Sequence, residues 1–232
     1  MRSIYRRFSA AVALTFLFEV TAQAANTTID LQALDSGTYS SVTAGHVSTE
    51  ASIYLQQDSV NSSRNFFVFD FSGLNMANLL SADLYANNAW NYSPESQLSY
   101  SLYDVTTNTT DLRASGTGQY SIFNDLGSGV SYASLELSNP GRYDNLVMAF
   151  NQSGLNAAKA TTGLFAFGGA ITSQTGGVAF LFGDNENPSS PFSYGLRLTF
   201  SETVTAVPEA DSYAMLLAGL GMVSLVARRR NK

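Results

Sequence analysis

The side chains that could carry chemistry in this 232-residue chain are few in kind, because it has no cysteine and a single histidine, His46. A Ser-His-Asp site would have to use His46, and no Gly-x-Ser-x-Gly elbow occurs. We interpret His46 as an exposed residue at the start of a strand. The lack of cysteine excludes disulfides, zinc-thiolate sites and thiol catalysis. We therefore assign no catalytic, cofactor-binding or histidine-based metal residue.

Carboxylates are the remaining candidates for acid–base catalysis. A glycosidase needs two of them about 5–10 Å apart, and fifteen acids lie between residues 25 and 206 without a cluster that singles out a pair. Asp70 interrupts an apolar strand, and a buried carboxylate must be paired or well hydrogen-bonded. We therefore predict a structural role for Asp70, with Arg64 or Arg197 as the candidate partner. A carbohydrate-active hydrolase that uses paired carboxylates stays open as the alternative function.

The segment Gly183–Asn187 could bind calcium, because it places several oxygen-bearing side chains in one turn. The candidate ligands are Asp184, Asn185 and Glu186. The segment lacks the Asp-x-Asp-x-Asp-Gly spacing of a defined calcium loop, and as a solvated turn it needs no ion. Calcium is therefore the only cofactor that we consider, as one of two readings.

Trp90, Tyr92 and Tyr100, with Asn87, Asn88 and Asn91, could form a platform for sugars. Exposed aromatic rings stack on the apolar faces of sugars while amides hydrogen-bond their hydroxyls. We predict a loop at residues 87–95 that carries Trp90, the only tryptophan, and Tyr92. The alternative is that Trp90 folds back over the edge of a sheet as part of the core.

Short alternating segments separated by turns indicate an all-β protein. We expect an antiparallel, jelly-roll-like sandwich of about nine or ten strands. In the apolar run 66–71, Phe67, Phe69 and Phe71 should face one way and Phe66 and Val68 the other. Residues 152–161 suggest one short helix. The predicted strands cover residues 47–56, 66–71, 81–86, 100–105, 130–137, 146–150, 163–167, 178–182 and 194–200.

The charge of the predicted body, residues 25–206, excludes several partners. It has five basic and fifteen acidic residues, a net charge of −10, whereas the whole chain carries −6. Such a body repels phosphate backbones and anionic lipid. We therefore expect no nucleic-acid partner.

The N-terminus has the pattern of a secretory signal peptide. Arg2, Arg6 and Arg7 precede an apolar core at residues 8–18, and Ala22-Gln23-Ala24 supplies the small-x-small site. We predict a signal helix over residues 1–24 that signal peptidase removes after Ala24.

The C-terminus combines Pro208 and Glu209, an apolar run at residues 213–227, and Arg228, Arg229 and Arg230. The run has 15 residues, fewer than the roughly 20 of a stable transmembrane helix, and the basic end holds it on the cytoplasmic side. This tail (207–232) resembles the PEP-CTERM sorting signal of Gram-negative bacteria, with Ala210 in place of the second proline. An ordinary tail anchor is the alternative.

The resemblance implies a transient stay in the inner membrane, cleavage by an exosortase near Pro208, and release to the cell surface or extracellular matrix. The blocks FFVFDFSGLNMANLLSADLYA, SLYDVTT, IFNDLGSGVSYAS, FAFGGAITS, FLFGD and LRLTF also resemble uncharacterised bacterial surface proteins with a presumed β-sandwich. We expect a non-catalytic surface or matrix component that contacts exopolysaccharide.

Overall fold

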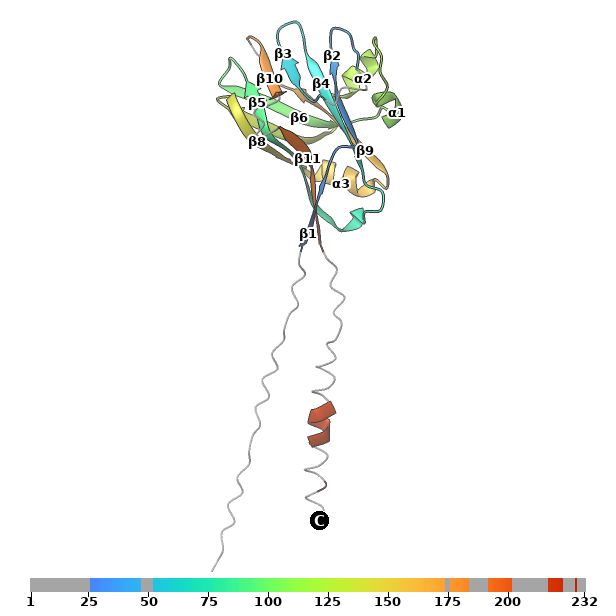
Figure 1. Cartoon of the computed structure of the whole chain (residues 1–232). Helices are drawn as coiled ribbons and strands as arrows, with labels where there is room; N and C mark the ends of the chain where they lie inside the picture. The colour runs from blue at the N-terminus through green and yellow to red at the C-terminus, as the bar shows by residue number, and fades with distance from the viewer. Residues whose placement is uncertain are drawn as a thin grey trace, which may run out of the picture. The chain divides into compact units, whose positions relative to one another are not determined.

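The computed structural model describes residues 26–46, 52–173, 176–183, 192–201, 217–222 and 228 (Figure 1). The chain divides into two compact units, one of residues Ala25–Glu202 and one of residues Met1–Ala24 with Thr203–Lys232. In the second unit, residues 217–222 are helical. Among the residues described, no helix has the length and hydropathy needed to cross a membrane. The predicted signal helix, and most of the predicted C-terminal helix, lie outside the described residues.

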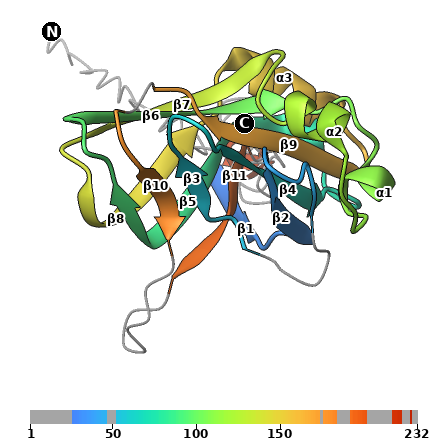
Figure 2. The ribbon, with the colours of Figure 1, turned by 90° about the horizontal axis from the view of Figure 1, so that it is seen from above.

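The first unit, which we call the body, has two antiparallel sheets (Figure 2). Sheet A contains β1 (Asn26–Leu31), β11 (Ser193–Ser201), β5 (Leu79–Tyr92), β10 (Ala179–Gly183), β3 (Leu55–Gln57) and β8 (Gly141–Ala149). Sheet B contains β2 (Asp35–Ser40), β4 (Ser63–Asp70), β9 (Leu164–Ile171), β6 (Gln97–Asp104) and β7 (Ser131–Ser138). The helices are η1 (Met76–Asn78), α1 (Thr109–Leu112), α2 (Tyr120–Asp125) and α3 (Gln152–Ala160).

The strand order is that of a jelly roll, which confirms the predicted fold. Sheet A runs β1-β11-β5-β8 and sheet B runs β4-β9-β6-β7. Numbered along the chain, these eight strands have the orders 1-8-3-6 and 2-7-4-5, the arrangement of two Greek keys. The strand β2 extends sheet B beyond β4. The strands β3 and β10 extend sheet A, where β10 shares one edge of β5 with β11.

Alternation along β4 divides its side chains between two apolar clusters, as the sequence predicts. Phe67 and Phe69 join the core between the sheets, whereas Phe66 and Val68 pack beneath α1 and α2 on the other face of sheet B. All four side chains are fully buried, and burial of each contributes about 1.5–3 kcal/mol. Sheet B is therefore covered on both faces, and Figure 2 shows α1 and α2 beside it.

The structure differs from the sequence analysis in several elements. The predicted loop at 87–95 is wrong over residues 87–92, which continue β5. The strands β1 and β2 and the helices α1 and α2 were not predicted, because their sequences are polar and short. Of the predicted strand at 47–56, residues 47–51 lie outside the described part, and only Leu55 and Gln56 belong to a strand, β3. The predicted helix at 152–161 is confirmed as α3.

Candidate functional site

A bulge in β5 decides which side chains face solvent on sheet A. Leu84 and Ala86 are buried, so Tyr85 points outward, but after the bulge Ala89 is buried and Trp90 points outward. Two residues of β5, Asn87 and Asn88, there oppose one of β8, Asn145, and Asn88 is in the left-handed region at φ 52°. An extra residue inverts the alternation of a strand. Without it, Trp90 and Tyr92 would point into the core.

Five aromatic side chains gather on this outer surface, and we call them the aromatic face: Tyr54, Trp90, Tyr92, Tyr143 and Phe180. Ring centroids lie 5.6 Å apart for Tyr54 and Phe180, 5.5 Å for Phe180 and Trp90, and 6.3 Å for Trp90 and Tyr92, distances at which aromatic rings attract one another. Tyr143 pairs with Trp90 across β8 and β5 and therefore shares its face. Tyr92 is 40% and Tyr143 49% exposed.

The polar tips of these side chains are available to a ligand. Within the described part of the chain, the hydroxyls of Tyr54, Tyr92 and Tyr143 and the indole Nε1 of Trp90 make no hydrogen bond. Aromatic residues that combine an apolar ring with a polar tip are favoured at interfaces. The aromatic face thus offers apolar rings and hydrogen-bonding groups together.

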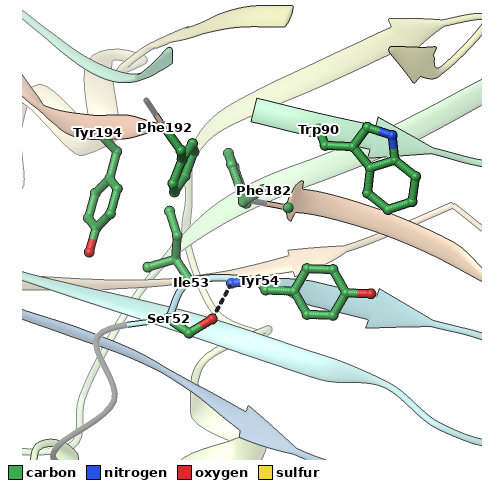
Figure 3. A pocket seen from close by; sticks show the side chains of 8 residues that line it. Ser52, Ile53, Tyr54, Trp90, Phe182, Phe192 and Tyr194 are labelled. Carbon is green, nitrogen blue, oxygen red and sulfur yellow. Dashed lines mark hydrogen bonds between the residues drawn. The ribbon is translucent and has the colours of Figure 1, made fainter. Parts of the chain in front are cut away.

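A pocket of about 600 Å³ adjoins the aromatic face (Figure 3). In Figure 3, Phe182 lies between Trp90 on one side and Phe192 and Tyr194 on the other. Ser52 accepts a hydrogen bond from the backbone N–H of Tyr54 at 3.4 Å in its wall. Because Tyr54 and Trp90 line the pocket and belong to the aromatic face, we call it the aromatic pocket.

Two backbone features hold the pocket in shape. Phe182 has a φ of 60°, an unfavourable conformation for a bulky residue, and its ring packs edge-on against Tyr100 at 5.1 Å. A Cβ at position 183 would lie 2.8 Å from Cε3 of Trp90, so only glycine allows the backbone this close to the indole. Strained backbone of this kind gathers at functional sites.

The aromatic pocket has the chemistry of a binding site. Its described lining includes no histidine, carboxylate or basic side chain. The hydroxyl of Tyr194 lies 2.6 Å from Oγ of Ser36, and burial raises the pKa of Tyr54. These groups can stack on a ligand and hydrogen-bond to it, but they do not form a nucleophile–base pair.

Two carboxylates and an arginine form a row across sheet A, away from the aromatic pocket. Asp30, Arg197 and Asp83 are in register on β1, β11 and β5, which separates the two acids by about 10 Å, two strand spacings. Arg197 donates to both oxygens of Asp30, at 2.8 and 3.2 Å, and this lowers the pKa of Asp30. Burial raises the pKa of Asp83 although Arg197 opposes the shift. The two acids thus differ in proton affinity.

The structure corrects the predicted environments of His46 and Asp70. His46 is 4% exposed, because the segment with α1 and α2 folds over it, and its ring stacks on Tyr39 at 5.3 Å. Asp70 is exposed at the end of β4, where it accepts a hydrogen bond from the backbone N–H of Ser72. The hydroxyl of Ser72, followed by this N–H, lowers the pKa of Asp70. The two candidate partners are bonded elsewhere, since Arg64 donates to the carbonyls of Phe123 and Asn124 and Arg197 pairs with Asp30.

Of the residues predicted for a sugar platform, Trp90 and Tyr92 lie together on the outer face of sheet A, whereas Tyr100 and Asn91 are buried and do not reach that face. Tyr100 is fully buried in the core, and Asn91 is buried and donates to Oδ2 of Asp144. Trp90 is half-buried on the outer face rather than folded over the sheet edge. Asn87 lies on β5 and donates to Oγ of Ser193 at 3.2 Å.

Sequence reasoning did not select Tyr54, Tyr143 or Phe180 as part of the site. Tyr54 stands between the buried Ile53 and Leu55, and Phe180 stands between the buried Ala179 and Leu181. No pattern within the sequence pairs these segments with β5, because that pairing depends on the topology of sheet A.

The predicted calcium ligands Asp184, Asn185 and Glu186 lie outside the described residues. Among the residues that are described, no group of three or more histidine, cysteine or acidic side chains could hold a metal ion. Calcium binding at this turn stays a prediction.

Comparison with known protein families assigns a role to the C-terminal segment of the chain. Residues 206–230 match the PEP-CTERM protein-sorting motif. The chain carries a PEP-CTERM sorting signal. No curated protein matches the chain. The body is therefore interpreted from its own residues, and the PEP-CTERM signal supplies its destination.

The PEP-CTERM match confirms the resemblance inferred from the tail. Pro208, Glu209 and the three arginines Arg228, Arg229 and Arg230 all fall within the matched range. A PEP-CTERM protein is exported toward the cell surface and processed by an exosortase. Of these residues the structure describes Arg228 alone. Ala22 and Ala24 lie outside the described residues, so the signal peptidase site stays a prediction.

Proposed function

We propose that the protein is a non-catalytic component of the cell surface or extracellular matrix that contacts exopolysaccharide through the aromatic face and the aromatic pocket. The observation that carries the proposal is the cluster of Tyr54, Trp90, Tyr92 and Phe180 on the uncovered face of sheet A. Exposed aromatic clusters mark interaction sites, and rings with free polar tips suit the alternating apolar and hydroxyl surfaces of sugars.

The destination of the protein supports the same ligand. Export by a PEP-CTERM signal brings the body to the compartment in which surface polysaccharide is found. We propose that the chain first enters the inner membrane through its C-terminal segment, that signal peptidase and exosortase remove the two ends, and that the body of residues 25–206 is the mature protein. Jelly rolls include lectin domains, although a fold alone does not fix a function.

Affinity electrophoresis tests the proposal. The processed protein, isolated from a host that exports it, should migrate more slowly in a gel that contains the polysaccharide of that host. Trp90→Ala should abolish the retardation. Tyr120→Ala is the control, because Tyr120 is an exposed aromatic residue, at 55%, on α2 away from sheet A. Equal migration of the native protein with and without polysaccharide would refute the proposal.

A carbohydrate-active hydrolase is the second candidate. It is supported by Asp83 and Asp30, whose pKa values shift in opposite directions, as an acid and a base require. Their separation of about 10 Å is near the upper limit for an inverting glycosidase, and Arg197 lies between them. Release of reducing sugar from the host polysaccharide, lost in Asp83→Asn, would establish this function in place of the first.

A further inference from the structure

A second pocket, of about 390 Å³, lies next to the aromatic pocket, and Tyr54 lines both of them. Hydroxyl and amide side chains line this second pocket, which we call the polar pocket: Thr38, Ser40, Gln56, Asn61, Ser62 and Ser63. The two pockets therefore adjoin at Tyr54, with aromatic walls on one side of it and hydrogen-bonding walls on the other, and we call the pair the groove.

The amides of the polar pocket are held in a defined orientation by Asp58. Gln56 Nε2 and Asn61 Nδ2 each donate to Oδ2 of Asp58 at 3.3 Å. Oδ1 of Asp58 accepts from the backbone N–H groups of Val60 and Asn61 at 2.7 and 2.6 Å, and these bonds lower the pKa of Asp58 to about 2. Asp58 is thus a charged, fixed acceptor at neutral pH, and it acts on the pocket as a positioning residue.

This arrangement leaves acceptors for a ligand. With their nitrogens committed to Asp58, Oε1 of Gln56 and Oδ1 of Asn61 make no hydrogen bond within the described residues. The hydroxyl of Thr38 donates to the carbonyls of Ser52 and Tyr54 at 2.7 and 3.1 Å, which fixes the wall shared by the two pockets. Fixed carbonyl and hydroxyl oxygens are the partners that sugar hydroxyl donors require.

The charges around the groove disfavour an acidic ligand. Neither pocket of the groove has a charged side chain in its described lining. Arg64 lines a neighbouring pocket that shares Ser62 and Ser63 with the polar pocket, and its guanidinium donates to the carbonyls of Phe123 and Asn124. Arg197 and Arg142, the basic residues of sheet A, are paired with Asp30 and Asp144. A body of net charge −10 repels anions. A uronate or sulfated sugar would therefore meet no cationic side chain among the described residues that line the two pockets.

We propose that the groove binds a neutral glycan chain across two subsites, with one sugar residue stacked in the aromatic pocket and the following residues hydrogen-bonded in the polar pocket. This inference rests on the proposed function and adds to it the class of ligand and a second contact region. It assigns Gln56 and Asn61 to direct contact with sugar hydroxyls.

Binding of defined oligosaccharides to the processed protein, measured by calorimetry, tests the inference. The probes are cellohexaose and maltohexaose, their disaccharides, and a hexagalacturonate of equal length. We expect at least one neutral hexasaccharide to bind about tenfold or more tightly than its disaccharide and than the hexagalacturonate. A double variant, Gln56→Ala with Asn61→Ala, should lose about tenfold or more in affinity for the hexasaccharide, as expected for two hydrogen bonds.

The control is the double variant Gln152→Ala with Asn156→Ala, which removes an equivalent amide pair on α3, bonded at 2.8 Å, and should bind as the native protein does. Hexagalacturonate binding as tight as that of the neutral probes would overturn the inference without any variant. So would undiminished hexasaccharide binding by the Gln56→Ala and Asn61→Ala variant while Trp90→Ala abolishes it, a result that leaves the proposed function intact. Failure of every oligosaccharide to bind would overturn this inference, and the proposed function would fall with it only if the host polysaccharide also left the migration of the native protein unchanged.

Discussion

Tyr100 provides a direct test of the assignment of residues to core and surface. It is fully buried, and its hydroxyl donates to Oδ1 of Asn65 at 2.7 Å. Asn65, also fully buried, donates from Nδ2 to the carbonyl of Ile53 at 3.0 Å, in the wall of the aromatic pocket. Burial raises the pKa of Tyr100 well above its usual value of 10, so the hydroxyl stays protonated and acts as the donor.

Replacing Tyr100 by Phe removes this donor while keeping the ring and its contacts. It leaves a buried acceptor without a partner, which costs about 1–3 kcal/mol. For a body of this size each kcal/mol lowers the melting temperature by about 2–4 °C. Chemical unfolding of the processed protein, followed by circular dichroism, should show this loss in the midpoint with an unchanged slope.

The matched control is Tyr103→Phe on the same strand, because the hydroxyl of Tyr103 makes no hydrogen bond within the described residues. We expect no measurable change in its free energy of unfolding. If Tyr100→Phe were as stable as the native protein and instead lost affinity for glycan, Tyr100 would be a surface contact, and the reasoning about the core would be refuted.

Three further predictions follow from the site and the turns around it. Gly183→Ala should displace the indole of Trp90 and weaken glycan binding, whereas Gly163→Ala, whose Cβ would meet no atom within 4 Å, should not; tryptophan fluorescence and affinity electrophoresis would show the difference. The pKa of Asp58 falls from 3.8 to about 2 on folding, so its stabilising effect is complete above pH 3.8 and is lost as the pH falls through about 2; Asp58→Asn should remove this part of the acid sensitivity in unfolding measured between these values. Asn88→Ala should be less stable than Asn88→Gly by about 1 kcal/mol, because both variants lose the amide but only alanine places a Cβ at this positive φ; equal unfolding midpoints for the two would contradict this explanation of the bulge.

Local alternation predicted the parts of the fold that local physics decides. The opposite facing of Phe67 and Phe66 follows from the period of a strand, and both clusters are observed. The turn at Asn139 and Gly141 follows from residues that tolerate positive φ, and both adopt it, at 51° and 143°.

The sequence predictions were wrong where contacts between residues distant in sequence decide whether a side chain is buried or exposed. His46 is buried by a segment about 70 residues further along the chain, through a bridge to Gly116. The bulge at Asn88 inverts the alternation of β5, so the sequence around Trp90 resembles a loop. The aromatic face requires the pairing of Phe180 with Tyr92 across sheet A, which no local pattern specifies.

The pairing of β1 with β11 bears on how the body is made. Asn26 is opposite Ser201, so the first strand of the sandwich hydrogen-bonds to the last. If the N-terminus is exported first, β1 crosses the membrane before nearly all of the body. Its partner β11 follows last, so sheet A can be completed only late in translocation. Once it has closed, every described strand pair lies between residues 26 and 201, and trimming of the polypeptide outside that interval removes none of the ladders.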